Sequence, residues 1–155
     1  VIGPRRSAAS PPEGFDAIYT PDNLIEILPE ADFVSVCCQW TPETENLIGE
    51  ETLGAMKDGV VLCNLARGEI VDEAALKAAL AVAKIRGVGL DVYVGEFDRL
   101  PDPELWADDR VLFTPHISAA TDVRGARQID LFCRNLEAYV AGRPLDNVLD
   151  WSRGY

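Results

Sequence analysis

The sequence predicts an α/β domain of the doubly wound kind, built around a parallel β-sheet. Short continuous apolar runs alternate along the chain with segments whose apolar residues recur at helical spacing. Such runs suit the strands of a parallel sheet that is covered on both faces, and the repeated order of strand, helix and strand favours the doubly wound class. Because the chain opens directly on the strand-like Val1-Ile2-Gly3, we expect a domain that is incomplete at its N-terminus and starts inside a larger protein.

Five apolar runs are the expected strands. Four of them lie at residues 33–38 (FVSVCC), 60–63 (VVLC), 88–90 (VGL) and 111–113 (VLF), and residues 1–2 are expected to end a fifth. The stretch between residues 93 and 110 contains Pro101 and Pro103. We expect a long loop there, and loops of that length in compact domains are often functional, with disorder as the alternative.

Four segments between and after these runs are expected to be helical. Residues 20–22 (TPD) are a helix start signal, because a threonine cap precedes proline and an acid in the first turn. A second helix is expected at about residues 50–57, and a third opens at residue 72. The longest helix comes last and ends at Gly142. Its apolar face consists of Val123, Ala126, Ile129, Cys133, Leu136 and Val140.

The composition excludes several classes of protein. The 155 residues suit one domain with a sizeable core, and 48% of them are hydrophobic, which argues against intrinsic disorder. There are 26 acidic and 14 basic side chains, so the net charge is −12 and a nucleic-acid backbone would be repelled. No apolar run approaches the length of about 18 residues that a membrane-spanning helix needs, and no signal-peptide pattern is present.

The four cysteines, at positions 37, 38, 63 and 133, form no C-x-x-C pair. We expect reduced, buried thiols, which are typical of a cytoplasmic protein. Neighbouring strand residues point to opposite faces of a sheet, so Cys37 and Cys38 are not expected to bind one metal ion together. Because the chain has a single histidine, we expect no metal site.

Chemically useful side chains follow three of the expected strands. Arg67 comes shortly after the VVLC run, Asp91 and Glu96 follow the VGL run, and the only histidine, His116, follows the VLF run. Ligands of open α/β sheets bind beyond the carboxyl ends of the strands, so we expect these four side chains to gather at one edge. Each also has a simpler interpretation, as a surface ion pair, a turn cap, a solvated acid or an ordinary polar histidine.

Together these groups suit the reduction of a 2-oxo acid. A guanidinium can hold a carboxylate through two hydrogen bonds. A histidine beside a carbonyl can donate the proton, and a carboxylate next to that histidine stabilises its charged form near neutral pH. Because no side chain supplies a hydride, the hydride would have to come from a nicotinamide cofactor.

Four stretches resemble the signature sequences of the D-isomer-specific 2-hydroxyacid dehydrogenases. They are residues 41–44 (TPET), 64–76 (NLARGEIVDEAAL), 89–93 (GLDVY) and 114–118 (TPHIS), and their order and approximate spacing also match. The resemblance implies a Rossmann-like dinucleotide-binding domain, of which residues 1–142 are the C-terminal portion, and a tail, residues 143–155, that returns toward a substrate domain. The family's Gly-rich phosphate loop would precede Val1, so this chain alone is expected to bind dinucleotide weakly and to be inactive.

The resemblance also implies roles for individual residues. Arg67 would bind the substrate carboxylate and polarise the carbonyl, His116 would donate the proton, and Glu96 would keep that histidine protonated. Asp91 would contact the nicotinamide side of the cofactor. Beside Arg67 and His116, the residues expected to line the cofactor cleft are Cys38, Gln39, Thr44, Leu65, Ala66 and Ser118.

The chain departs from the usual family pattern at several of these positions. Gln39 stands where proline is usual, and Leu65 stands where threonine is usual. Phe97 follows the glutamate where proline is common, and Ser118-Ala119 replaces a common pair of glycines. The resemblance implies that residues 39 and 65 are cleft positions where most of the contacts are made by the backbone.

Two arginines favour NADP over NAD as the cofactor. In such folds an acid at the end of the second strand binds the ribose hydroxyls of NAD, whereas an arginine accepts the 2′-phosphate of NADP. Here Arg5 and Arg6 follow the first strand-like residues and no acid is present. We therefore expect NADP(H), with NAD as the alternative and a merely solvated basic pair as the simpler interpretation.

The expected reaction interconverts a small 2-oxo acid and a D-2-hydroxy acid. Residues 4–7 and 38–44 look most like the glyoxylate and hydroxypyruvate reductase branch of the family. The family resemblance implies a homodimer of the full-length protein, and we expect no nucleic-acid or membrane partner. Two other functions stay open: an NAD(H)-binding sensor of the corepressor kind on the same fold, and a flavodoxin-like regulatory module.

Overall fold

Two units make up the computed structural model, which describes residues 1–6 and 10–151. The first unit, Val1–Thr114, contains both β-sheets of the described chain. The second begins at Pro115 and contains the long helix α5 (Arg124–Val140).

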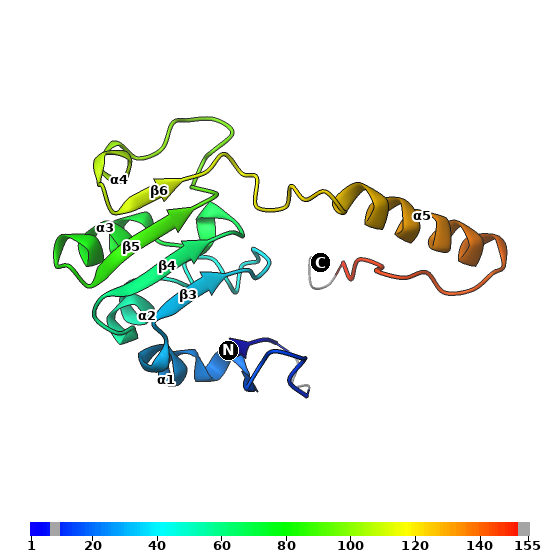
Figure 1. Ribbon diagram of the computed structural model, residues 1–155, viewed down its shortest axis with the longest axis horizontal. Helices are drawn as coiled ribbons and strands as arrows, with labels where there is room; N and C mark the ends of the chain where they lie inside the picture. Colours follow the sequence, from blue (N-terminus) through cyan, green and yellow to red (C-terminus); the bar gives the residue numbers. More distant parts are fainter. Residues whose placement is uncertain (7–9, 152–155) are drawn as a thin grey trace. The chain divides into compact units, whose positions relative to one another are not determined.

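Four parallel strands form the main sheet of the first unit. They lie side by side in the order β3 (Phe33–Val36), β4 (Val60–Asn64), β5 (Ile85–Leu90) and β6 (Val111–Phe113) (Figure 1). All three pairings between them are parallel. The predicted parallel sheet is confirmed, and the predicted bounds of β6 are those observed, whereas β3 ends two residues earlier than expected and β5 starts three residues earlier.

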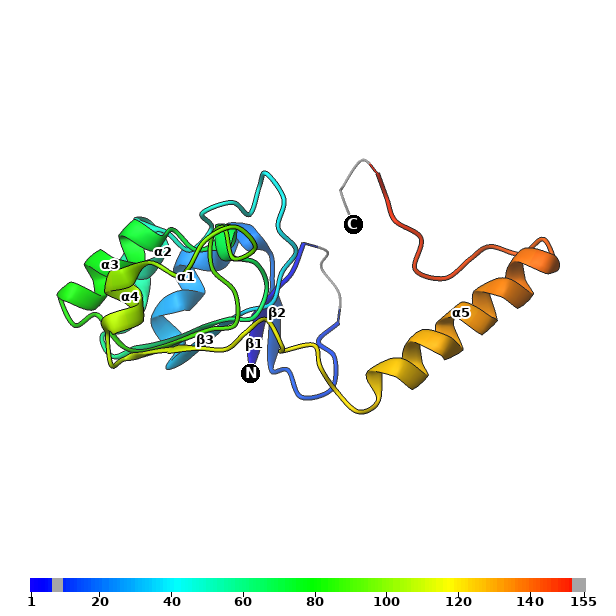
Figure 2. The ribbon, with the colours of Figure 1, turned by 90° about the horizontal axis from the view of Figure 1, so that it is seen from above.

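Short helices cover one face of this sheet (Figure 2). They are α1 (Leu24–Ile27), α2 (Glu50–Ala55), α3 (Glu73–Ala81) and α4 (Pro103–Ala107). In β4 the side chains at positions 60, 62 and 64 are buried, and those at 61 and 63 are half-buried. Consecutive right-handed crossovers that proceed in one direction along a sheet place their helices on the same side.

The opposite face of the sheet is more open. Phe33 and Leu112 are 69% and 67% exposed, and the Arg86 guanidinium lies over the Phe33 ring at 5.5 Å from its centroid. Within the first unit, the helices therefore cover one face of the sheet, and apolar side chains on the other face are exposed. The short apolar runs reflect burial under the helices, and period-two alternation decides which residues of each strand face them.

A second, two-stranded sheet pairs β1 (Ile2–Pro4) with β2 (Ala17–Tyr19) in parallel. Ile2 aligns with Ala17 and Pro4 with Tyr19. The sequence predicted the first of these strands and missed the second. Three residues without a fully buried side chain give too short a pattern to separate a strand from a loop.

The helices differ in detail from the predicted segments. The first is only one turn of α-helix, flanked by 3₁₀ turns at Pro21–Asn23 and Leu28–Glu30. Helix α4 lies inside the stretch that was predicted to be a loop, and this is a correction. Asp102 caps α4 by accepting from the amides of Glu104 (2.9 Å) and Leu105 (3.3 Å), and Leu105 is fully buried. Two prolines concealed this start signal, although proline in a first helical turn is favourable.

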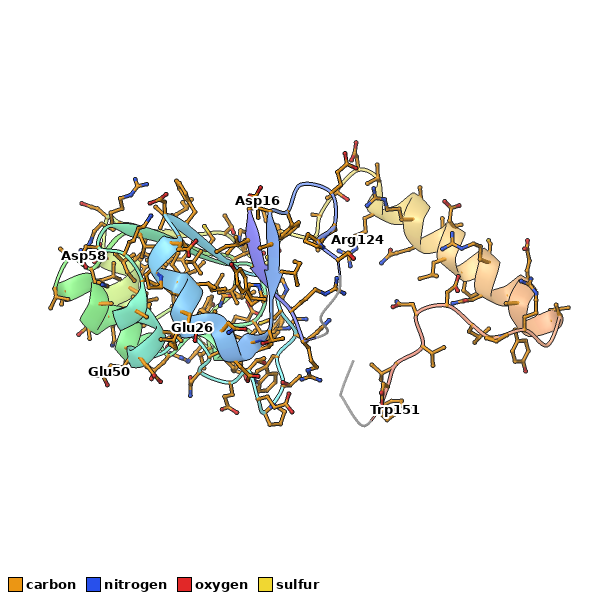
Figure 3. All side chains as sticks on the ribbon, turned by 90° about the horizontal axis from the view of Figure 1, so that it is seen from below. Asp16, Glu26, Glu50, Asp58, Arg124 and Trp151 are labelled. Atoms are coloured by element: carbon orange, nitrogen blue, oxygen red, sulfur yellow. The ribbon has the colours of Figure 1, made fainter. Side chains whose placement is uncertain are left out.

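In the second unit, α5 confirms the predicted last helix. It ends in a Schellman motif, in which Arg143 donates to the Ala138 carbonyl at 2.8 Å and Gly142 donates to the Tyr139 carbonyl at 3.1 Å. The positive φ of Gly142, 64°, explains the glycine. Apolar side chains on the expected face, such as Ile129 at 64% exposed, stand open in this unit. Figure 3 shows Arg124 in the first turn of α5 and Trp151 on the segment that follows the helix.

Among the described residues, no helix is long and apolar enough to cross a membrane. The buried core lies between the main sheet and its helices. Its largest fully buried apolar side chains include Leu53, Met56, Leu62, Ile70, Leu76, Ile85 and Leu105. This core fixes the carboxyl ends of β3–β6, where the candidate site lies.

The cap of α3 gives a first test of these local interactions. Asp72 accepts hydrogen bonds from the amides of Ala74 (2.8 Å) and Ala75 (3.1 Å). Asp72→Ala should lower the free energy of unfolding by about 1 kcal/mol, whereas Asp72→Asn, which keeps an acceptor, should lose much less. Urea denaturation followed by circular dichroism measures both. Equal urea midpoints for Asp72→Ala and the unchanged chain would show that the cap contributes nothing.

Candidate active site

Arg67 lies in a tight loop just beyond β4. The loop is held by Asn64, which is 1% exposed. Its side-chain amide donates to the Arg67 carbonyl at 2.8 Å, and its carbonyl oxygen accepts from the Ala66 amide at 3.1 Å. The Arg67 guanidinium is exposed and donates to the Ala66 carbonyl at 2.6 Å. A buried asparagine therefore fixes the backbone that presents Arg67 and the exposed Leu65 at the rim.

Gly68 brings this loop into direct contact with the segment that follows β5. A Cβ atom at Gly68 would lie 2.2 Å from the carbonyl carbon of Tyr93 and 2.4 Å from the amide nitrogen of Val94. Real Cβ atoms do not approach backbone that closely, so only glycine fits here. The contact brings the loop of Arg67 against the chain two residues ahead of Glu96.

Asp91 sits at the end of β5 and is 2% exposed. Its carboxylate accepts a hydrogen bond from the Thr114 hydroxyl, and its amide donates to the Asn64 carbonyl at 3.0 Å. The Thr114 amide donates to the Leu90 carbonyl at 2.9 Å. Asp91 thus ties the ends of three neighbouring strands together, and its predicted contact with the cofactor stays a prediction.

Glu96 is half-buried in a turn that follows β5. The turn closes on Gly95, whose carbonyl accepts from the amides of Asp98 (2.9 Å) and Arg99 (3.0 Å). Gly95 has a φ of 75°, which explains a glycine at this position. The Tyr93 hydroxyl donates to the Arg99 carbonyl at 3.0 Å and closes the same turn from its other side.

The loop after β3 carries Cys38, Gln39 and Thr44. Thr44 is half-buried, donates from its hydroxyl to the Gln39 carbonyl at 2.7 Å, and accepts from the Thr41 amide at 2.8 Å. The structure therefore brings two of the predicted cleft residues, Gln39 and Thr44, together. Thr41, which is 9% exposed, was not predicted to act here, although it lies in the TPET stretch.

The cysteines are not buried as predicted. Cys37, Cys38 and Cys133 are exposed, and Cys63 is intermediate. The prediction failed for Cys37 and Cys38 because β3 ends at Val36, so both thiols lie beyond the strand. Within the described residues, no three His, Cys, Asp or Glu side chains are grouped so that they could hold a metal ion.

The two N-terminal arginines lie beyond the end of β1 and differ in their contacts. The Arg5 amide donates to the Tyr19 carbonyl at 2.9 Å, and the residue is exposed. The Arg6 guanidinium pairs with the Glu43 carboxylate, which belongs to the loop after β3. The pair joins the end of β1 to the loop that holds Gln39 and Thr44.

His116 and Ser118 belong to the second unit, on the exposed segment before α5. His116 has a φ of 52°, in the left-handed region that few residues other than glycine adopt. A strained backbone of this kind is often found at functional sites. The meeting of His116 with Arg67 and Glu96 stays a prediction.

A parallel sheet with polar groups at its carboxyl edge is the architecture of the Rossmann-like, dinucleotide-binding class. The family follows from comparison: residues 1–118 match the NAD binding domain of the D-isomer specific 2-hydroxyacid dehydrogenases. The chain belongs to this family, which confirms the resemblance found in its motifs and replaces the alternative of a flavodoxin-like module.

Several curated relatives are named as reductases, and others are named as dehydrogenases. The chain is 42% identical over 126 residues to a glyoxylate reductase of Pyrococcus furiosus. This match covers 81% of the chain and 36% of the relative. It is 36% identical over 125 residues to a hydroxypyruvate reductase of Blautia hydrogenotrophica, with 81% and 38% covered. The chain thus spans less than half of the length of these relatives.

Solved structures agree with this assignment. A D-isomer specific 2-hydroxyacid dehydrogenase from Xanthobacter autotrophicus, crystallised with NADPH and MES, matches 99% of this chain and 62% of its own, with a TM-score of 0.88 and 36% identity. An NADPH-dependent glyoxylate/hydroxypyruvate reductase from Sinorhizobium meliloti, in complex with NADP and sulfate, matches 99% and 49%, with a TM-score of 0.86 and 27% identity.

Gly68 and Gly54 form a matched pair for testing the contact between the two loops. A Cβ at Gly54, in α2, would meet no atom within 4 Å. Gly54→Ala should stabilise the chain by about 0.5–1 kcal/mol because alanine favours helix. Gly68→Ala should destabilise it by about 1–3 kcal/mol or more, because backbone must move. Urea titration measures the free energy of unfolding of both variants. An unchanged free energy of unfolding in Gly68→Ala would contradict the close approach of the two loops.

Proposed function

We propose that the protein containing this chain is an NAD(P)H-dependent reductase of small 2-oxo acids, of the glyoxylate and hydroxypyruvate kind. The observation that carries the proposal is the backbone contact at Gly68, which joins the loop of Arg67 to the segment of Glu96 at the carboxyl edge of the sheet. Family membership and the named activities of the relatives support it.

Three side chains have distinct roles in the proposed reaction. The exposed Arg67 guanidinium holds the substrate carboxylate through two hydrogen bonds and polarises the adjacent carbonyl. His116 donates a proton to the carbonyl oxygen, and Glu96 stabilises the charged imidazole before that transfer. A nicotinamide cofactor held at this edge would supply the hydride that the side chains cannot provide. The product is a D-2-hydroxy acid.

The residues present fit a dinucleotide at this edge. Gln39, Thr44 and Leu65 would line the proposed cleft together with Cys38, Ala66 and Asp91 of the same unit. Ser118, in the second unit, is proposed to contribute as well. At Gly68, an absent side chain lets the loop after β4 lie close to the segment after β5. Ligands of open α/β sheets bind beyond the carboxyl ends of the strands, which is the edge where both loops lie.

We propose NADP(H) as the preferred cofactor, with NAD(H) as the alternative. The support is the placement of Arg5 and Arg6 directly beyond β1, where a 2′-phosphate would be read, with Glu43 as a partner that the phosphate would have to displace from Arg6. NADPH or NADP accompanies two of the matched structures.

The cofactor proposal predicts a specific pattern of kinetics. In the full-length enzyme, replacing both Arg5 and Arg6 with alanine should lower kcat/KM for NADPH by about 10- to 100-fold, the loss expected for hydrogen bonds to a charged group. The value for NADH should change little, because it carries no 2′-phosphate. A clear preference of the unchanged enzyme for NADH would refute the proposal.

The proposed roles of His116 and Arg67 are separable. His116→Ala should lower kcat by roughly 100- to 10,000-fold while NADPH still binds. Arg67→Lys, which keeps the charge and loses the fork, should mainly raise KM for the oxo acid. Steady-state assays with glyoxylate and hydroxypyruvate, with fluorescence titration of NADPH as the control, measure both. An active His116→Ala enzyme would overturn the acid–base assignment.

The NAD(H)-binding sensor is the remaining alternative class. NADPH consumption by the full-length protein with glyoxylate, hydroxypyruvate and pyruvate distinguishes the two. If none of the three acids causes NADPH consumption while the cofactor still binds tightly, the result would favour the sensor. The reductase names of the curated relatives favour the enzyme.

We further propose that residues 1–142 are the C-terminal portion of the dinucleotide-binding domain and that residues 143–155 form a tail toward a substrate domain; residues 7–9 and 152–155 of these ranges lie outside the described residues. The full-length protein is proposed to be a cytoplasmic homodimer that binds neither nucleic acid nor membranes. The net charge of −12 supports the lack of affinity for nucleic acid.

A further inference from the structure

Helix α3 contacts the long segment after β5 through two charged side chains one turn apart. Lys77 follows Glu73 by four positions, so the two side chains lie on the same face of the helix. Glu73 contacts the turn that carries Glu96, and Lys77 contacts the start of α4. The two contacts divide the segment into two parts, each held by one side chain.

The carboxylate of Glu73 binds the turn on both sides of Glu96. One oxygen accepts from the Val94 amide at 3.2 Å, and the other pairs with the Arg99 guanidinium at 3.1 Å. The Glu73 side chain is only 20% exposed, whereas that of Arg99 is 47% exposed. A single carboxylate therefore links the residue two before Glu96 to the residue three after it.

The side chain of Arg99 also lies across the turn. A Cβ at Gly95 would come within 2.8 Å of the Arg99 Nε atom. Arg99 thus closes over the residue immediately before Glu96 while its guanidinium reaches Glu73. The turn therefore lies between α3 and the Arg99 side chain, and both contact it.

Apolar packing contributes little to the shape of this turn. Phe97 and Leu100 are each 84% exposed. A segment with few buried apolar contacts opens locally at low cost unless polar contacts hold it. A side chain that must meet a partner within a fraction of an ångström needs such support from its neighbours.

Lys77 provides the matched contact that does not involve the turn. Its ammonium lies 2.9 Å from Asp102 and 3.2 Å from Glu104, at the start of α4. The hydrogen bond from Lys77 lowers the pKa of the Asp102 carboxyl below its ordinary value. Removing Lys77 should therefore loosen α4 and leave the turn of Glu96 in place.

We propose that Glu73 is a positioning residue for the reaction, which acts by holding the turn of Glu96 against the loop of Arg67. The inference rests on the proposed function, because the position of Glu96 matters only where Glu96 charges the proton donor. Glu73 is not expected to touch substrate or cofactor. Its contribution to the rate should pass entirely through Glu96.

The kinetic test compares three variants of the full-length enzyme. Glu73→Ala should lower kcat by about 10- to 100-fold, as expected when a catalytic group is misplaced by a distant change, with an unchanged KM for NADPH. Glu73→Gln keeps an acceptor for the Val94 amide and should lose less. Lys77→Met removes the other charged contact of α3 and should keep a normal kcat. Equal losses of kcat in Glu73→Ala and Lys77→Met would overturn the proposal.

A double-mutant cycle separates positioning from general stability. If Glu73 acts through Glu96, Glu73→Ala should lower kcat no further once Glu96→Gln is present. Multiplying losses in the double variant would overturn the inference. A normal kcat in the Glu96→Gln variant would overturn the role of Glu96 and, with it, this inference. If Glu96→Gln is impaired and Glu73→Ala has a normal kcat, only the inference about Glu73 is overturned.

Amide hydrogen exchange tests the contact without any assay of activity. In the 155-residue chain, Glu73→Ala should speed exchange at Val94, which donates to the lost carboxylate, and at Asp98 and Arg99, which close the turn. Lys77→Met should leave these amides unchanged. Unaltered exchange of the three amides in Glu73→Ala would overturn the proposal even if kcat falls.

Discussion

The contact of Gly68 with the backbone of Tyr93 and Val94 is the constraint on which the candidate site depends. Two loops that leave different strands meet there without an intervening side chain. Packing this close leaves no room for adjustment, since protein interiors are dense and resist added volume. Arg67 stands next to the contact on one loop, and Glu96 follows it on the other, so a change at Gly68 would disturb both. Asn64 and Asp91 hold the adjacent strand ends in place. The Asn64 side chain bonds to neighbouring backbone groups, and the Asp91 carboxylate accepts from a hydroxyl group.

Helix α3 organises the other side of this arrangement. Asp72 caps its first turn, and Glu73 and Lys77 hold the segment that runs from β5 to α4. Near its C-terminal end the Leu80 carbonyl accepts from Arg110 at 2.7 Å. Arg110 also binds Asp108 and holds the pKa of that carboxyl at about 2. One short helix thus contacts both ends of the connection between β5 and β6. These contacts explain how a long segment with exposed apolar side chains keeps a defined path.

Much of this could be predicted from residues close together in the chain. The parallel strands, the cap at Asp72 and the glycine stop at Gly142 after α5 follow from local patterns, because burial periodicity, capping and glycine turns act over a few residues. Helix α4 was missed because its start signal, Asp102-Pro103, lies among prolines that also mark loops, and only the burial of Leu105 distinguishes a helix there. The exposure of Cys37 and Cys38 was missed because the apolar run continues beyond the point where β3 stops pairing with β4.

The sequence by itself determined the class of fold and the family, and it supplied the residues of the candidate site, since these depend on short motifs whose chemistry is carried by the side chains themselves. Only the tertiary structure decided which groups meet: Gly68 with Tyr93, Asp91 with Thr114, Arg6 with Glu43, and Glu73 with both Val94 and Arg99. These contacts join residues that are far apart in the chain. Their partners are set by the order of strands and the close packing of the loops between them, and no local pattern encodes that arrangement.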